Sequence, residues 1–121
     1  MNQKQIQIRH KEFKDQLTNE CTMNRKGCSK CWKGVTNEHY IVMSNIVWWL
    51  VNQGYDVFTE AEFKKGGRAD IVCWISGQAF AIEVLHTETD ERYEAKFDKY
   101  PEDFTMVKIK TGGFDISSFV L

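Results

Sequence analysis

Apolar residues recur at helical spacing in two parts of the chain. The first part is residues 2–19, where three apolar side chains share roughly one face: Ile6, Phe13 and Leu17. The second is residues 36–53, which we expect to begin at a capping residue, Thr36 or Asn37, and to end before Gly54. The core face of this second helix is predicted to hold Ile41, Val42, Ile46, Trp49 and Leu50.

Shorter apolar runs predict four strands, at residues 55–59, 69–75, 79–85 and 104–109. Only Ser76, Gly77 and Gln78 separate the second from the third, which indicates a tight hairpin. Residues 89–100 again have helical spacing and end at Pro101, whereas residues 114–121 fit no single pattern. The order helix, strand, hairpin, helix, strand predicts an α/β (α+β) domain with a central mixed sheet flanked by helices. A chain of 121 residues is sufficient for one such domain.

Two of the predicted strands each carry one acidic residue within otherwise apolar sequence, Asp70 and Glu83. Burying a lone carboxylate costs several kcal/mol unless it is paired or binds a metal. Side chains alternate along a strand, so neighbouring strands can direct both carboxylates to one place. Mg²⁺ accepts one or two such ligands and completes its shell with water and phosphate. The alternative is a pair of surface carboxylates on an amphipathic hairpin.

The order of these motifs resembles the PD-(D/E)XK nuclease superfamily. "RADIV" and "AIEV" look like its two strand motifs, with Asp70 and Glu83 as the strand acids and Glu38 as the acid on the first helix. The CoiA-like branch of competence proteins looks closest. Its pattern is matched by Glu38-His39, Glu60, Arg68-Ala69-Asp70, Ile82-Glu83, and Lys96 four residues before Tyr100. The likeness covers about residues 36–109.

The resemblance implies a restriction-endonuclease-like core and a metal-dependent endonuclease that hydrolyses DNA phosphodiester bonds. It implies Mg²⁺ or Mn²⁺ held by Asp70 and Glu83, with Glu38 or Glu60 assisting, and a homodimer as one possible assembly. One position departs from the pattern: Leu85 stands where the superfamily usually has lysine and the CoiA-like branch often has glutamine. Lys96 could take the role of that lysine; it could equally be a solvated helix residue. The small chain favours structure-selective or non-specific cleavage.

Three cysteines with the spacing Cys21-x6-Cys28-x2-Cys31 precede the second predicted helix. Such clustering indicates a tetrahedral thiolate site, and structural zinc fits it best. The fourth ligand is His39 or His10, although His39 also matches the nuclease-like motif. An iron–sulfur cluster or free thiols are the alternatives. The remaining cysteine, Cys73, lies inside a strand and is expected to be a buried thiol.

Charge is distributed unevenly along the chain, whose formal net charge is −1. Residues 1–35 contain eight basic and three acidic residues, a net charge of +5, which leaves −6 for residues 36–121. We therefore expect a basic N-terminal arm with the cysteine cluster at 1–35, and the resemblance implies a nuclease-like core at 36–121. Phosphate-backbone contacts are expected from Arg25, Lys26, Lys30, Lys33 and Arg68, although Arg68 could instead be a counter-ion of the acidic site.

Two other functions remain open at this point. The departure at Leu85 suits a catalytically inactive nuclease-like domain that binds nucleic acid. A zinc-stabilised protein-interaction module could use Trp48, Trp49 and Trp74 as its contact surface, although such tryptophans are more often core residues. The polar N-terminus and the lack of an apolar run of about 20 residues predict an intracellular (cytoplasmic) protein without membrane contact.

Overall fold

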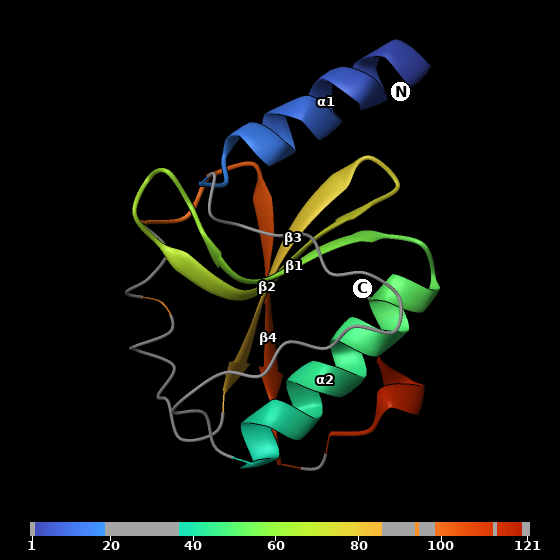
Figure 1. Ribbon diagram of the computed structural model, residues 1–121, viewed down its shortest axis with the longest axis vertical. Coiled ribbons are helices and arrows are strands. Elements are labelled where there is room, and N and C mark those ends of the chain that lie inside the picture. The colour runs from blue at the N-terminus through green and yellow to red at the C-terminus, as the bar shows by residue number, and fades with distance from the viewer. Residues whose placement is uncertain (1, 19–36, 86–93, 95–98, 113, 120–121) are drawn as a thin grey trace.

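The computed structural model describes residues 2–18, 37–85, 94, 99–112 and 114–119. Two helices and four strands account for most of these residues (Figure 1). Their bounds are α1 Gln3–Asp15, α2 Asn37–Asn52, β1 Asp56–Glu62, β2 Arg68–Ile75, β3 Gln78–Leu85 and β4 Phe104–Lys110, followed by the short 3₁₀ helix η2, Ile116–Ser118. The predicted α+β class is confirmed, and the strands begin and end near the predicted positions except that β1 extends to Glu62.

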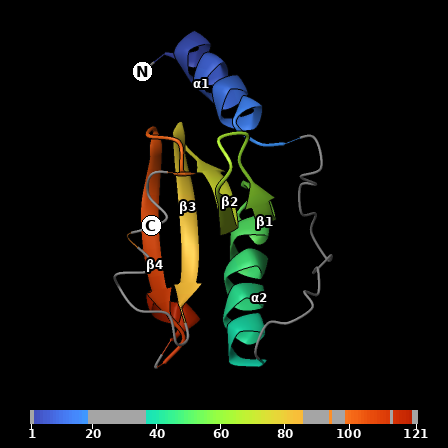
Figure 2. The same cartoon turned by 90° about the vertical axis from the view of Figure 1, so that its left-hand side faces the viewer.

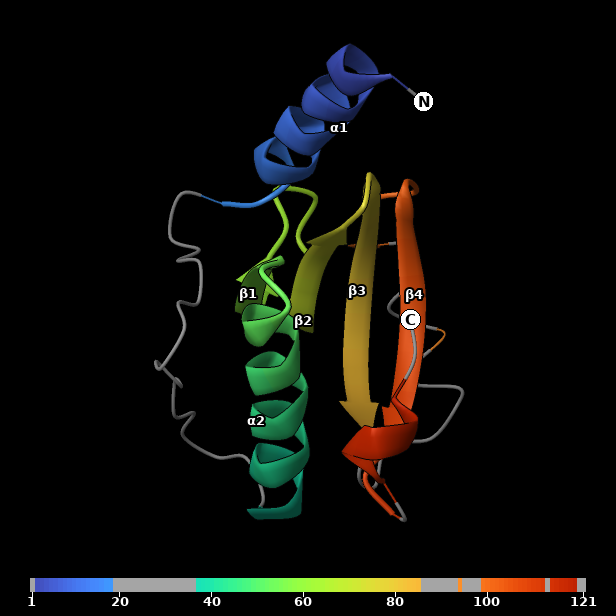
Figure 3. The ribbon, with the colours of Figure 1, turned by 90° about the vertical axis from the view of Figure 1, so that its right-hand side faces the viewer.

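The four strands form one mixed sheet in the order β1-β2-β3-β4. The first three are antiparallel neighbours, and β4 runs parallel to β3. Figures 2 and 3 show α2 running along the sheet while α1 lies beyond the end at which the β2–β3 hairpin turns. The N-terminus of α2 and the carboxyl end of β3 therefore lie at the same end of the sheet, away from α1.

The predicted hairpin turn is confirmed. Ser76 and Gly77 form a two-residue connection between β2 and β3, with φ angles of 49° and 87°. Two consecutive residues with positive φ are typical of the turn whose twist matches antiparallel strands. This short connection fixes the register of β2 on β3, in which Trp74 pairs with Ala79 and Ile71 with Ile82.

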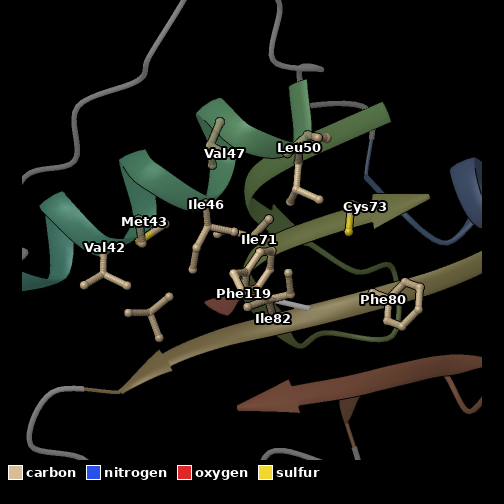
Figure 4. Close-up of a cluster of buried hydrophobic side chains, with 12 residues drawn as sticks. Val42, Met43, Ile46, Val47, Leu50, Ile71, Cys73, Phe80, Ile82 and Phe119 are labelled. Atoms are coloured by element: carbon tan, nitrogen blue, oxygen red, sulfur yellow. The ribbon is translucent and has the colours of Figure 1, made fainter. Parts of the chain in front are cut away.

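One face of the sheet packs against α2. Val42, Met43, Ile46, Val47 and Leu50 project from the helix toward Ile71, Cys73, Phe80 and Ile82 (Figure 4). Each large apolar side chain buried in this way contributes about 1.5–3 kcal/mol to the free energy of unfolding. The predicted core face was wrong at Ile41, which is 49% exposed. The expectation that the tryptophans are core residues was wrong at Trp48, which is 66% exposed, because the buried stripe of α2 turns both side chains outward.

The opposite face of the sheet is covered mainly by aromatic side chains. Phe13 of α1 packs against Trp74 and Phe104, with both ring-centroid separations 5.5 Å. Leu17, just after α1, forms a β-bridge with Phe63. A 2.6 Å contact between Nε2 of His10 and Oδ2 of Asp56 adds a polar link from α1 to β1. Phe13 of α1 and Leu17 just after it are thus part of the core.

Candidate functional site

The sheet is interrupted on both sides of Asp70. Between β1 and β2, Thr59 pairs with Ile71 and Ala61 with Ala69, but the intervening Glu60 and Asp70 do not pair. Between β2 and β3 the pairing ends at Ile71 and Ile82, one position before Asp70 would meet Glu83. The register is the same before and after the β1 interruption, so no residue is inserted there. The strands β1 and β2 therefore lose their pairing at Glu60 and Asp70 while the register between them stays the same.

The Asp70 side chain spans the opening toward β3. Its Oδ2 accepts a hydrogen bond of 2.8 Å from the backbone N–H of Val84. Asp70 thus provides a hydrogen-bond partner for the Val84 N–H, which lies just beyond the last paired residues of β2 and β3. The carboxylate itself stays about one quarter exposed, at 23% of its side-chain surface. Asp70 is consequently fixed in position while remaining open to a ligand.

Glu83 is almost fully buried and is held by Tyr100. The carboxylate is on a residue only 3% exposed. The hydroxyl oxygen of Tyr100 lies 2.6 Å from Oε1 of Glu83 and 2.7 Å from the carbonyl oxygen of Arg68. A phenol has one proton and donates it to one of these oxygens at a time. The Tyr100 ring packs on Phe63 at 5.3 Å, so the hydroxyl is fixed between the strand that carries Glu83 and the start of β2.

Asp70 and Glu83 line the same cleft, as expected from the sequence, although the regular pairing of β2 with β3 ends one position before them. The cleft has a volume of about 340 Å³ and is lined by Gly66, Gly67, Arg68, Asp70, Glu83, Lys99 and Tyr100. A larger cavity of about 550 Å³ lies at the other end of the sheet, between α1 and the β2–β3 hairpin, and contains neither carboxylate. The smaller cleft is therefore the candidate site.

The first turn of α2 approaches this cleft through His39. Its Nε2 lies 3.4 Å from Oδ2 of Asp70, a separation that is long for a charge-assisted hydrogen bond. The interaction with Asp70 raises the pKa of His39, burial opposes the rise, and the negative charges of Asp70, Glu83 and Glu60 add to it. Glu38, the helix acid implied by the resemblance, is exposed in the same turn. His39 is thus the α2 residue that contacts Asp70.

Glu60 lies across from Asp70 in a strained backbone conformation. Its φ is 47°, in the left-handed region that costs a non-glycine residue about 1–3 kcal/mol. Partial burial of its carboxyl group raises the pKa of Glu60, although the residue as a whole is exposed. Arg68 and His39 lower this pKa, and Asp70 raises it. Glu60, Asp70 and His39 therefore interact electrostatically.

Arg68 and Leu85 lie beside the two acids. Nη2 of Arg68 is 3.5 Å from Oε2 of Glu62, and both side chains are largely exposed. Arg68 therefore has a counter-ion outside the acidic pair, on β1. Leu85 is buried at 3% exposure, so the position at which the superfamily usually carries lysine holds a buried apolar side chain here.

Several predicted site residues lie outside the described residues: Lys96, the cysteines Cys21, Cys28 and Cys31, and the basic residues Arg25, Lys26, Lys30 and Lys33. The zinc site, the basic loop and the role of Lys96 therefore remain predictions. The two predicted candidates for the fourth zinc ligand are described, and they lie beside different carboxylates: His10 beside Asp56 and His39 beside Asp70. Cys73 is a buried free thiol, as predicted, and burial raises its pKa to about 12.

The donor set suits a cation that needs few protein ligands. Within the described ranges, no group of three or more His, Cys, Asp or Glu side chains is arranged to hold a metal ion. Two carboxylates, Asp70 and Glu83, nevertheless share the cleft. Mg²⁺ and Mn²⁺ prefer oxygen ligands, and Mg²⁺ commonly takes one or two carboxylates with the rest from water and phosphate. The cleft fits such an ion better than it fits Zn²⁺, which prefers nitrogen and sulfur ligands.

Two features of the cleft were not predicted from the sequence, the lining by Lys99 and the close approach at Gly67. A Cβ atom at Gly67 would clash with the carbonyl oxygen of Lys99 and would lie 2.7 Å from Cδ1 of Tyr100. The sequence could have indicated Lys99, because it directly precedes Tyr100, which belongs to the matched motif.

No family model, no curated protein and no solved structure matches this chain. Within the described residues, none of the helices combines the length and the apolar character needed to span a membrane.

Proposed function

We propose that this protein is a metal-dependent endonuclease that hydrolyses DNA phosphodiester bonds. The observation that carries the proposal is the shared cleft of Asp70 and Glu83 at the place where β2 loses its pairing on both sides. Two acids in a cleft rimmed by Arg68 and Lys99 suit a cation bound together with a phosphate. The superfamily resemblance of the same acids supports the same chemistry.

In this proposal Asp70 and Glu83 hold Mg²⁺ or Mn²⁺, and Glu60, whose charge interacts with that of Asp70, assists. When bound, such an ion lowers the pKa of a coordinated water and stabilises negative charge on phosphate. Tyr100 and the Val84 N–H keep the two carboxylates in position. In the overall reaction, the water oxygen bonds to phosphorus, one P–O ester bond breaks, and the departing oxygen takes a proton. Each cut yields a phosphomonoester and a hydroxyl end.

The test is incubation of the purified protein with labelled single-stranded, duplex and branched DNA, in Mn²⁺ and in EDTA. The proposal expects cleavage of at least one substrate in Mn²⁺ and none in EDTA. The same panel with labelled RNA separates a deoxyribonuclease from a nuclease that accepts both.

A second candidate function is nucleic-acid binding without cleavage, and the burial of Leu85 favours it. A leucine can neither orient water nor neutralise phosphate. This candidate expects no product on any substrate together with DNA binding that weakens steeply as salt is raised.

Structural zinc held by Cys21, Cys28 and Cys31 is a separate part of the proposal. It expects one zinc per chain by elemental analysis of protein purified without added metal. The double variant Cys28→Ser/Cys31→Ser is expected to lose that zinc, whereas Cys73→Ser is expected to keep it, because Cys73 lies in the core beneath α2. An equal zinc content in all three proteins contradicts the site.

A further inference from the structure

A phosphodiester in the cleft would add negative charge beside two carboxylates. The metal ion held by the two acids offsets part of this charge, and a positively charged side chain within reach of the phosphate oxygens strengthens the binding further. Leu85, buried beside Glu83, supplies no positive charge. Among the described residues that line the cleft, Arg68 and Lys99 carry positive charge.

Arg68 is the weaker choice of these two. Its guanidinium forms an ion pair with Glu62 at 3.5 Å, so part of its charge is already compensated. Lys99, in contrast, belongs to a segment that is tied to the cleft wall by several contacts.

Three interactions fix the backbone at Lys99. Its carbonyl group packs so closely on Gly67 that no Cβ atom fits between them. The next residue, Tyr100, donates its hydroxyl proton to the carbonyl of Arg68 or to Glu83. Nζ of Lys65 donates to the carbonyl oxygen of Tyr100 at 3.3 Å. A long, exposed side chain on a fixed backbone can place its ammonium group at the mouth of the cleft.

We propose that Lys99 binds a non-bridging oxygen of the phosphodiester held in this cleft and so supplies the positive charge that Leu85 cannot. The assignment rests on the proposed function, since it needs a nucleic-acid phosphate in the site. Lys99 acts by charge and hydrogen bonding and transfers no proton.

Lys108 provides a matched control. It is the register partner of Glu83 on the parallel strand β4 and is exposed. Met106, two residues earlier, packs with the aromatic face of the sheet, so strand alternation places Lys108 on the same face as Glu83. Lys108 nevertheless does not line the cleft. Replacement of Lys108 therefore measures the effect of removing a positive charge near Glu83, and replacement of Lys99 measures the effect of removing one from the cleft.

The experiment compares full-length wild type, Lys99→Met, Lys99→Arg and Lys108→Met by two measurements. The first is the single-turnover cleavage rate in Mn²⁺ over a range of DNA concentrations. Removal of one positioned donor commonly costs about 10²–10³-fold in rate, and we expect Lys99→Met to lose that much at saturating DNA. Lys99→Arg should keep most of the rate, and Lys108→Met should change it less than about threefold.

The second measurement is the salt dependence of DNA binding in Ca²⁺, in the absence of Mn²⁺ and Mg²⁺. Loss of one phosphate contact lowers the slope of log K against log salt by about one, and this is expected for Lys99→Met alone. An unchanged slope in Lys99→Met, or an equal loss of cleavage in Lys108→Met, overturns the assignment while leaving the nuclease intact. Wild-type protein that neither cuts nor binds DNA contradicts the proposed function and the role of Lys99 with it.

Discussion

The hydroxyl oxygen of Tyr100 lies 2.6 Å from a carboxylate oxygen of Glu83, and both residues are buried at 3% exposure. These residues are 17 positions apart in the chain, and their contact joins β3 to the segment that precedes β4. A buried carboxylate is stable only when its oxygens have partners. The structure of the candidate site therefore depends on a tyrosine hydroxyl that holds one of its two acids in place.

Replacement of Tyr100 by phenylalanine removes this hydrogen bond and keeps the ring packing on Phe63. Loss of a hydrogen bond to a buried charged group costs about 1.5–3 kcal/mol. We expect Tyr100→Phe to lower the free energy of unfolding by that amount, measured by urea denaturation. Tyr55→Phe is the control, because Tyr55 packs on the opposite core, and it should change stability by less than about 0.5 kcal/mol. Equal stability of Tyr100→Phe and wild type contradicts the role of the hydroxyl.

Addition of one methyl group at Gly67 should disturb the cleft wall. The new Cβ would meet the Lys99 carbonyl and lie 2.7 Å from Cδ1 of Tyr100, so the backbone must shift. Such overpacking costs about 1–3 kcal/mol, which thermal or urea denaturation can detect. Gly112→Ala is the matched control, since nothing lies within 4 Å of a Cβ at that glycine. Similar losses of stability in both variants would show that the approach of Lys99 to Gly67 is not as close as described.

The strained backbone of Glu60 predicts that glycine is more stable than alanine at this position. Glu60→Ala and Glu60→Gly both remove the carboxylate, but only glycine adopts a φ of 47° without strain. We expect Glu60→Gly to be more stable than Glu60→Ala by about 1 kcal/mol, measured as the difference in free energy of unfolding. At an ordinary strand position, glycine would instead be the less stable of the pair, and that order would contradict the observed conformation.

The buried thiol of Cys73 predicts slow chemical modification. Burial raises its pKa to about 12, so very little thiolate is present at pH 8, and the residue is completely buried. We expect peptide mapping after brief alkylation of the native protein to find Cys73 unmodified. The same treatment in urea should modify it fully. Rapid labelling of native Cys73 would place the thiol at the surface and contradict the packing of β2 beneath α2.

Features set by local sequence were predictable. Gly54 ends α2 with a φ of 88°, and Ser76 with Gly77 makes the two-residue turn, because both depend on neighbouring residues alone. The shared cleft of Asp70 and Glu83 was also expected from sequence, because a tight hairpin places the two residues opposite each other, although the β2–β3 pairing ends one position before them. These predictions need no knowledge of distant contacts.

The remaining features depend on contacts between distant parts of the chain. The left-handed conformation of Glu60 arises where β1 and β2 lose their pairing, and no local pattern marks that place. The backbone of Lys99 lies at the cleft because it packs on Gly67, which is 32 residues away in the sequence. The exposure of Trp48 was missed because α2 is apolar on most of its surface, so periodicity does not define which stripe is buried.

A comparison of three proteins tests whether Asp70 holds the metal ion of a nuclease site. Mn²⁺-dependent DNA cleavage is measured for wild type, Asp70→Asn and Asp56→Asn. Each asparagine keeps the shape of its side chain, and the two aspartates both contact a histidine, Asp70 in the cleft and Asp56 at the other end of the sheet. This role of Asp70 predicts Mn²⁺-dependent cleavage that falls at least about 100-fold in Asp70→Asn and persists in Asp56→Asn. Cleavage that persists in Asp70→Asn, or no cleavage by the wild type on any substrate, contradicts it.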